Sequence, residues 1–204
     1  MTRGKLPLGI QNFEELRKGG YLYADKTDMV WQIANGDKYN FLSRPRRFGK
    51  SLLVSTLQCY FEDRKELFEG LKIMELEKDW IKRPVIHFSM NLGGSDAESL
   101  YHYLDDTLTK YEEIYGKRAT EATLSNRFTG IIERAYQQSG EQVAVLVDES
   151  VRLPDYQGRN WRSLQTGISK QRSKRIPTTT LMLMLPARRR SSAWLWYSTK
   201  KTED

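Results

Sequence analysis

The segment from Tyr39 to Phe61 constrains this chain most strongly, because it joins an apolar run, a basic loop and a helix-like stretch. The run Tyr39–Leu42 is typical of a short buried strand, and apolar residues recur at helical spacing after Lys50. The loop between them ends in Gly49-Lys50-Ser51. A strand, a loop and a helix in this order can wrap a phosphate with loop N–H groups and the helix N-terminus. The segment therefore predicts a phosphate-binding loop.

The end of this loop matches the diagnostic part of the pattern G-x-x-x-x-G-K-[ST]. In that pattern the glycine lets the backbone approach the phosphates, the lysine reaches the β- and γ-phosphates, and the hydroxyl ligates Mg²⁺. Arg44 stands where the first glycine is expected, and its Cβ restricts the turn. The tripeptide alone therefore fits an ordinary turn between strand and helix equally well. As nucleotide-binding residues we predict Arg46, Arg47, Phe48, Gly49, Lys50, Ser51 and Leu52.

A second motif favours the nucleotide interpretation. Val143–Glu149 is an apolar run that ends in two carboxylates, the Walker B pattern. A buried parallel strand reads as a continuous apolar run, and open α/β sheets bind ligands at the carboxyl ends of their strands. We therefore predict that Asp148 holds Mg²⁺ together with Ser51, and that Glu149 and Lys50 act in catalysis, Glu149 by activating the attacking water. The alternative is an ordinary strand that ends in a solvated Asp-Glu pair.

The rest of the chain up to residue 149 predicts one more core strand and several helices. Val85–Met90 reads as another core strand, and helices are expected over about 13–18, 51–61, 95–116 and 120–138, and from a cap at Thr27 or Asp28 to Gly36. Strands alternating with helices predict an α/β fold, a P-loop NTPase-type parallel sheet with flanking helices that is incomplete after the third strand. Tyr21–Ala24 is a brief strand-like run, and Glu62–Trp80 favours short surface helices or turns. His87, within the second core strand, is interpreted as a satisfied core histidine.

Composition limits the class of protein. The chain of 204 residues is long enough for one sizeable core, and its single cysteine, Cys59, suits a reducing cytosol. No apolar run approaches the roughly 18 residues of a membrane span, so we expect a soluble, cytoplasmic protein. The acidic residues Asp105, Asp106, Glu112 and Glu113 are expected on a solvated helix face.

The positive charge is concentrated in the last quarter of the chain. Residues 1–149 hold 21 basic and 23 acidic residues, a net charge of −2, whereas residues 150–204 hold 12 and 3, a net charge of +9. We therefore divide the chain into a domain over 1–149 and a basic tail of low order over 150–204.

Four blocks of this sequence resemble the bacterial AAA-ATPase-like family over residues 6–149. The blocks are Leu8-Gly9-Ile10-Gln11-Asn12-Phe13, Tyr23-Ala24-Asp25-Lys26-Thr27, Phe41–Ser51 with its R-P-R-R-F-G-K-S core, and Leu146-Val147-Asp148-Glu149. Arg44 matches the family's own variant of the phosphate-binding loop. The resemblance implies ATP and Mg²⁺ as ligands, ATP hydrolysis as the reaction, and, in full-length members, a following PD-(D/E)XK nuclease-like domain.

After Glu149 the resemblance ends. The sequence continues with Ser150-Val151-Arg152-Leu153-Pro154, where the family usually has Tyr-Asp and Lys-Pro, and acidic residues become rare. We hypothesise a frameshift after Glu149, which would leave a truncated and inactive domain. One alternative is a non-catalytic module that holds nucleic acid with the basic loop and this tail, using Arg188–Arg190 for phosphates and Trp194 and Trp196 for stacking. Another is a genuine divergent segment that packs on the sheet.

Overall fold

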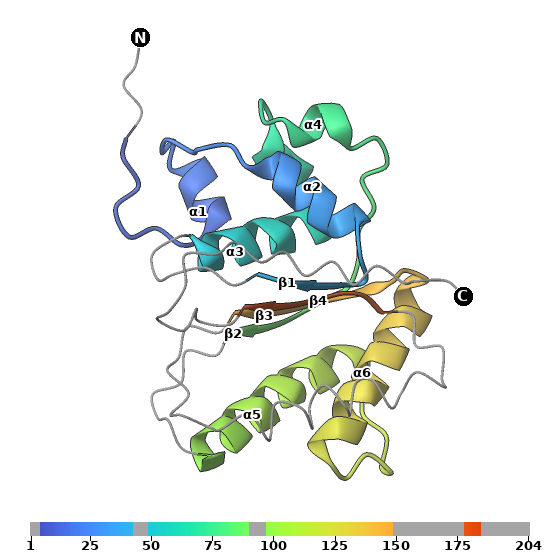
Figure 1. Ribbon diagram of the computed structural model, residues 1–204. Coiled ribbons are helices and arrows are strands. Elements are labelled where there is room, and N and C mark those ends of the chain that lie inside the picture. The colour runs from blue at the N-terminus through green and yellow to red at the C-terminus, as the bar shows by residue number, and fades with distance from the viewer. Residues whose placement is uncertain (1–4, 43–48, 90–96, 149–177, 185–204) are drawn as a thin grey trace, which may run out of the picture.

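The computed structural model describes residues 5–42, 49–89, 97–148 and 178–184, which form a sheet with helices on both faces (Figure 1). The elements are, in chain order, α1 (Phe13–Lys18), α2 (Thr27–Asn35), β1 (Tyr39–Phe41), α3 (Lys50–Phe61), the 3-10 helix η1 (Lys65–Phe68), α4 (Ile73–Leu76), β2 (Val85–Ser89), α5 (Ala97–Tyr115), α6 (Leu124–Ser139), β3 (Val143–Asp148) and β4 (Thr178–Met184). Within the described part of the chain, no helix is both long and apolar enough to cross a membrane.

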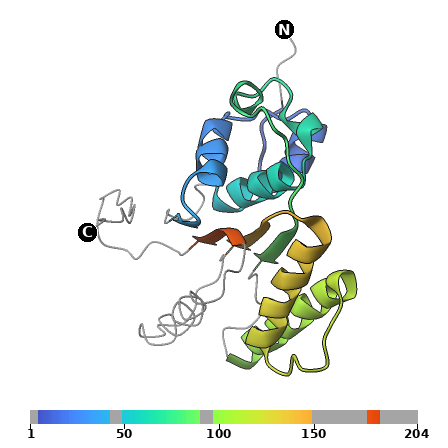
Figure 2. The same cartoon turned by 90° about the vertical axis from the view of Figure 1, so that its right-hand side faces the viewer.

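The sheet has the strand order β1-β4-β3-β2, and every neighbouring pair is parallel. Helices α1 to α4 lie over one face, and α5 and α6 lie over the other (Figures 1 and 2). The chain moves across the sheet from β1 to β2 and then turns back to β3. Right-handed crossovers require the two connections to lie on opposite faces when the direction reverses. The predicted α/β class and parallel sheet are confirmed, and all carboxyl ends share one edge.

The three strands predicted from apolar runs are present: each begins at the predicted residue, and its described part ends one residue earlier. The fourth strand, β4, comes from the segment that we predicted to be a tail of low order. It pairs with both β1 and β3, with Leu181 opposite Tyr39 and Val145. The sheet therefore does not end with β3. The remainder of the predicted tail, including Arg188–Arg190, Trp194 and Trp196, lies outside the described residues.

Local hydrogen bonds to side chains mark the starts of α6 and α2. Helix α6 begins at Leu124 rather than near Thr120, because the side chain of Thr123 accepts the N–H of Asn126. Before α2, the carboxylate of Asp25 accepts from both the N–H and the hydroxyl of Thr27. The strand-like run that begins at Tyr21 forms an isolated bridge to Lys5 rather than a strand of the sheet.

The face that carries α3 has an apolar core. Phe13, Val30, Leu57 and Phe68 are fully buried, and this cluster includes Ala144 and Leu146 of β3. The segment between α3 and β2 forms short helices as predicted. However, Leu67, Phe68 and Ile73 within it are buried rather than on the surface. Aromatic rings pack in pairs here, with Phe13 and Phe68 centred 4.9 Å apart. This packing fixes α3 on the sheet.

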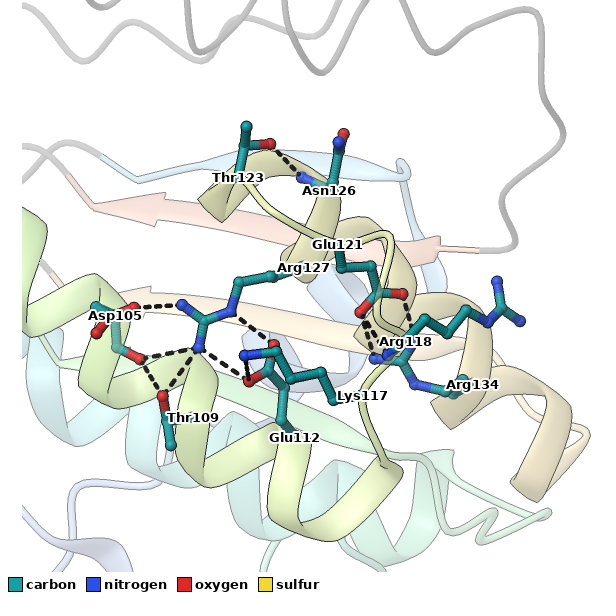
Figure 3. A network of polar contacts seen from close by, with 10 residues as sticks. All are labelled: Asp105, Thr109, Glu112, Lys117, Arg118, Glu121, Thr123, Asn126, Arg127 and Arg134. Atoms are coloured by element: carbon teal, nitrogen blue, oxygen red, sulfur yellow. Dashed lines mark hydrogen bonds and ion pairs between the residues drawn. The ribbon is translucent and has the colours of Figure 1, made fainter.

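The opposite face combines an apolar core with buried ion pairs between α5 and α6 (Figure 3). Arg127 of α6 donates to both oxygens of Glu112 at 2.6 and 2.9 Å, to the hydroxyl of Thr109 at 2.9 Å and to Asp105. Only 8% of Glu112 is exposed. The prediction of a solvated acidic face was therefore wrong at Glu112, because an arginine on the next helix takes the place of water.

A second buried pair joins the loop before α6 to the helix itself. Arg134 donates to the two oxygens of Glu121 at 2.5 and 3.0 Å, and both side chains are buried. Gly130 makes this approach possible, because a Cβ at that position would lie 1.9 Å from Oε1 of Glu121. The packing of α5 and α6 therefore includes buried ion pairs that leave no space for a larger side chain at Gly130.

Candidate functional site

The junction between the basic loop and α3 has the backbone geometry expected of a phosphate-binding turn. Gly49, directly before α3, has φ 69° and ψ 31°, the left-handed region that favours glycine. A Cβ there would meet no atom within 4 Å, so backbone conformation rather than space requires the glycine. Within the described residues, no side chain caps the start of α3, whose N-cap is Gly49. The first N–H groups of a helix have no partner inside the helix, so they can bind an anion.

Lys50, Ser51 and Leu52 form the first turn of α3 and are half-buried. Leu52 packs against the apolar cluster, and Leu53 and Val54 behind it are buried. Packing on the apolar cluster therefore holds this turn in place, and the turn carries the ammonium of Lys50 and the hydroxyl of Ser51. Arg46, Arg47 and Phe48, the other loop residues predicted to bind nucleotide, lie outside the described residues.

Asp148 ends β3 at the carboxyl edge of the sheet and is 6% exposed. Residues alternate between the two faces of a strand, and Ala144 and Leu146 pack in the same cluster as α3. Asp148 therefore faces the α3 side. Its Oδ1 is buried without a hydrogen-bond partner in the described part of the chain. Glu149, the predicted catalytic base, lies just outside that part.

The topology places these two groups at one edge and on one face. The N–H of Arg83, just before β2, donates to the carbonyl of Phe61 at 2.7 Å, so the end of α3 lies at the amino edge of β2. The start of α3 therefore points toward the carboxyl edge, where Asp148 lies. Helix α3 packs mainly on β3, so its first turn and Asp148 lie on the same side of the sheet at this edge.

These residues fit a magnesium-bound phosphate group. Ser51 and Asp148 supply a hydroxyl and a carboxylate, the oxygen ligands that Mg²⁺ prefers. The buried, unpartnered Oδ1 of Asp148 is the observation that favours such a group, because a buried carboxylate oxygen without a partner is costly.

His87 is a neighbour of Asp148 that the sequence interpretation underestimated. It lies on β2 opposite Leu146, and its Nε2 is buried without a partner among the described residues. The prediction of a core or near-core histidine agrees with its half-buried position, whereas the described residues supply Nε2 with no hydrogen-bond partner. Burial lowers the pKa of His87, and the charge of Asp148 opposes that shift. The proximity of His87 to Asp148 follows from the register of β2 and β3. The sequence alone does not specify that register.

A cavity of about 160 Å³ lies at the other end of α3. Its walls are Asn35, Tyr60, Glu77, Asp79, Ile81 and Arg83. The Tyr60 hydroxyl donates to Glu77 there. Because Tyr60 belongs to the last turn of α3, this cavity is separate from the Gly49–Ser51 turn.

Comparison with known proteins agrees with the resemblance. The model of the AAA-ATPase-like family, described as "Predicted AAA-ATPase", matches residues 7–151. The chain is also 41% identical over 152 residues to a protein of Azotobacter chroococcum mcd 1 described as "Uncharacterized protein in vnfD 5'region". The matched part is 73% of this chain and 29% of that relative, so the chain spans less than a third of it. No solved structure gives a significant match. The family match covers more than half of the chain, and the chain therefore belongs to the AAA-ATPase-like family.

Proposed function

We propose that this chain binds ATP with Mg²⁺ at the carboxyl edge of its sheet and that the intact domain hydrolyses the γ-phosphate. The observation that carries the proposal is the pairing of two features at that edge. The left-handed Gly49 opens α3, and Asp148 presents a buried oxygen without a partner on the same face. Membership of a family described as predicted ATPases supports the same conclusion.

Each residue has a defined task in this proposal. The N–H groups of the Phe48–Ser51 turn and the Lys50 ammonium bind the phosphates, together with Arg46, Arg47 and the N–H of Leu52. The Ser51 hydroxyl and the Asp148 carboxylate hold Mg²⁺, which neutralises charge on the phosphates when bound. Glu149 orients the attacking water and accepts its proton. In-line phosphoryl transfer depends mainly on such positioning and charge stabilisation.

The sheet topology supports this assignment. In open α/β sheets ligands bind outside the carboxyl ends of the strands, where the direction of the chain across the sheet reverses. Here the chain runs from β1 across to β2 and then back to β3, so the reversal falls between these two strands in the sequence. The first, β1, precedes Lys50, and the second, β3, ends in Asp148. The site therefore lies where parallel sheets place ligands.

Thermal unfolding with and without Mg-ATP tests the proposal. A ligand that binds only the folded state stabilises it by RT ln(1 + [L]/Kd), which is about 2.7 kcal/mol at a hundredfold excess over Kd. We expect Mg-ATP to raise the midpoint of the unmodified chain and to leave that of Lys50→Ala unchanged. Lys110→Ala is the matched control, because Lys110 is an exposed lysine of α5.

Equal midpoint shifts in Lys50→Ala and in the unmodified chain would contradict the proposal. Phosphate release by the folded chain then measures hydrolysis. We expect Glu149→Gln to keep the midpoint shift and to lose the release of phosphate, because only the activation of water depends on that carboxylate.

A further inference from the structure

Two buried polar atoms without partners lie on neighbouring strands beneath α3. They are Nε2 of His87 and Oδ1 of Asp148, and neither has a hydrogen-bond partner within the described ranges. Buried polar atoms nearly always have a partner, in the protein or in an ordered water. Two such atoms close together therefore indicate a shared partner.

The strand register shows how close they are. His87 lies opposite Leu146, and Ser89 lies opposite Asp148, so His87 and Asp148 are diagonal neighbours. Both face the α3 side, because Leu146 packs in the cluster of that face. Strands lie about 4.8 Å apart and rise about 3.3 Å per residue, so diagonal neighbours of a parallel pair lie roughly 8 Å apart. One water fits between an imidazole and a carboxylate at that spacing.

The backbone of His87 is fixed independently of its ring. The hydroxyl of Tyr111, on α5, accepts the N–H of His87 at 2.7 Å and lies 3.4 Å from its carbonyl oxygen. The charges of Asp148 and Glu62 both act on the imidazole. Glu62 accepts from Gln58 at 2.8 Å, whereas the described part of the chain gives Oδ1 of Asp148 no donor. Asp148 is therefore a better candidate than Glu62 to accept a hydrogen bond from the imidazole.

We propose that His87 is a positioning residue for Asp148, donating from Nε2–H through one water to the carboxylate so that Oδ1 is aimed at Mg²⁺. This inference rests on the proposed function. Partners of metal ligands orient those ligands, and their loss typically weakens metal binding about 10- to 100-fold. His87 therefore affects the metal rather than the nucleotide base or the phosphates.

The experiment measures how much Mg²⁺ is needed for ATP to stabilise the folded chain. At fixed ATP, Mg²⁺ is titrated, and the thermal midpoint is followed for each variant. His87→Phe removes the donor and keeps a ring, His87→Gln keeps a donor, and His102→Phe makes the same change at an exposed histidine of α5. Should His87→Phe not fold, His87→Met replaces it as the variant without a donor.

We expect the half-saturating Mg²⁺ concentration to rise about 10- to 100-fold in His87→Phe, with recovery in His87→Gln and no change in His102→Phe. A lower melting temperature with an unchanged Mg²⁺ requirement would show a purely structural role and overturn the inference. The proposed function fails separately, if Mg-ATP stabilises Lys50→Ala as well as it stabilises the unmodified chain.

Discussion

The two faces of the sheet hold their helices by different forces. On the α3 face, packing dominates: buried aliphatic and aromatic side chains of α1, α2, α3 and η1 meet Ala144 and Leu146 of β3. On the opposite face, an apolar core is joined by buried arginine–carboxylate pairs between α5, α6 and the loop that joins them. Apolar packing tolerates changes of pH and salt, whereas a buried ion pair requires both partners.

This difference matches the position of the candidate site. Lys50 and Ser51 begin the helix that is packed on the apolar face, so the candidate phosphate-binding turn has a rigid support. Lys50, Ser51, Leu52 and Asp148, the predicted site residues with a described position besides Gly49, are not on the ion-paired face. We infer that substitutions in α5 and α6 lower the free energy of unfolding more than they change the candidate site.

The largest expected effect comes from removing Arg127. In Arg127→Ala, Glu112 loses a bidentate partner while remaining buried. Breaking one partner of a buried pair typically costs about 3–5 kcal/mol. We expect urea unfolding of Arg127→Ala to show a loss of that size. The control is Arg118→Ala, whose partner Glu133 lies at 3.4 Å with both side chains exposed, and it should cost at most about 1 kcal/mol.

The double variant Arg127→Met, Glu112→Leu sharpens the test. Replacing a buried pair by apolar residues is often neutral, so the double variant should be more stable than Arg127→Ala. A loss below about 1 kcal/mol in Arg127→Ala would mean that water reaches Glu112, and the contrast between the two faces would disappear.

Local patterns in the sequence predicted the elements well. The strands β1, β2 and β3 are apolar runs bounded by polar or breaking residues, and the start of α3 is set by the glycine requirement at Gly49. Such signals depend on neighbouring residues alone. The positions of Lys50, Ser51 and Asp148 at strand and helix ends followed from them.

Contacts between distant residues could not be predicted in this way. Glu112 read as solvated because its partner, Arg127, is 15 residues away on another helix. The insertion of β4 between β1 and β3 depends on pairing across the whole chain. The proximity of His87 to Asp148 depends on strand register, which one sequence does not specify.

Acid should weaken the ion-paired face more than the apolar face. Hydrogen bonds from Arg127 and Arg134 lower the pKa values of Glu112 and Glu121. A carboxylate with a lowered folded-state pKa stabilises the fold above its unfolded value, about 4.3, and that contribution is lost as the pH falls through the folded value. We therefore expect the free energy of unfolding to fall below about pH 4, with a smaller slope in Glu121→Gln.

Glu14 provides the control on the other face. Hydrogen bonds from Arg64 and Lys18 lower its pKa to about 2, but its side chain is 35% exposed. Salt screens exposed pairs much more than buried ones. Glu14→Gln should therefore alter the acid slope only at low ionic strength, whereas Glu121→Gln should alter it in 0.5 M salt (about a 4 Å Debye length) as well. The opposite salt dependence would contradict the assignment.

The smallest expected effect concerns Cys59, which reports on the apolar face alone. Cys59 lies in α3, is 5% exposed, and burial raises the pKa of its thiol to about 12. The thiolate is the reactive form, so modification requires this face to open. Local openings can involve one part of a domain without the rest. If α5 and α6 open separately, Arg127→Ala should leave the rate of Cys59 alkylation nearly unchanged under native conditions.

If the rate instead rises by the full factor of the lost stability, about tenfold for each 1.4 kcal/mol, the two faces unfold as one unit. The ion pairs of α5 and α6 would then protect the candidate site directly.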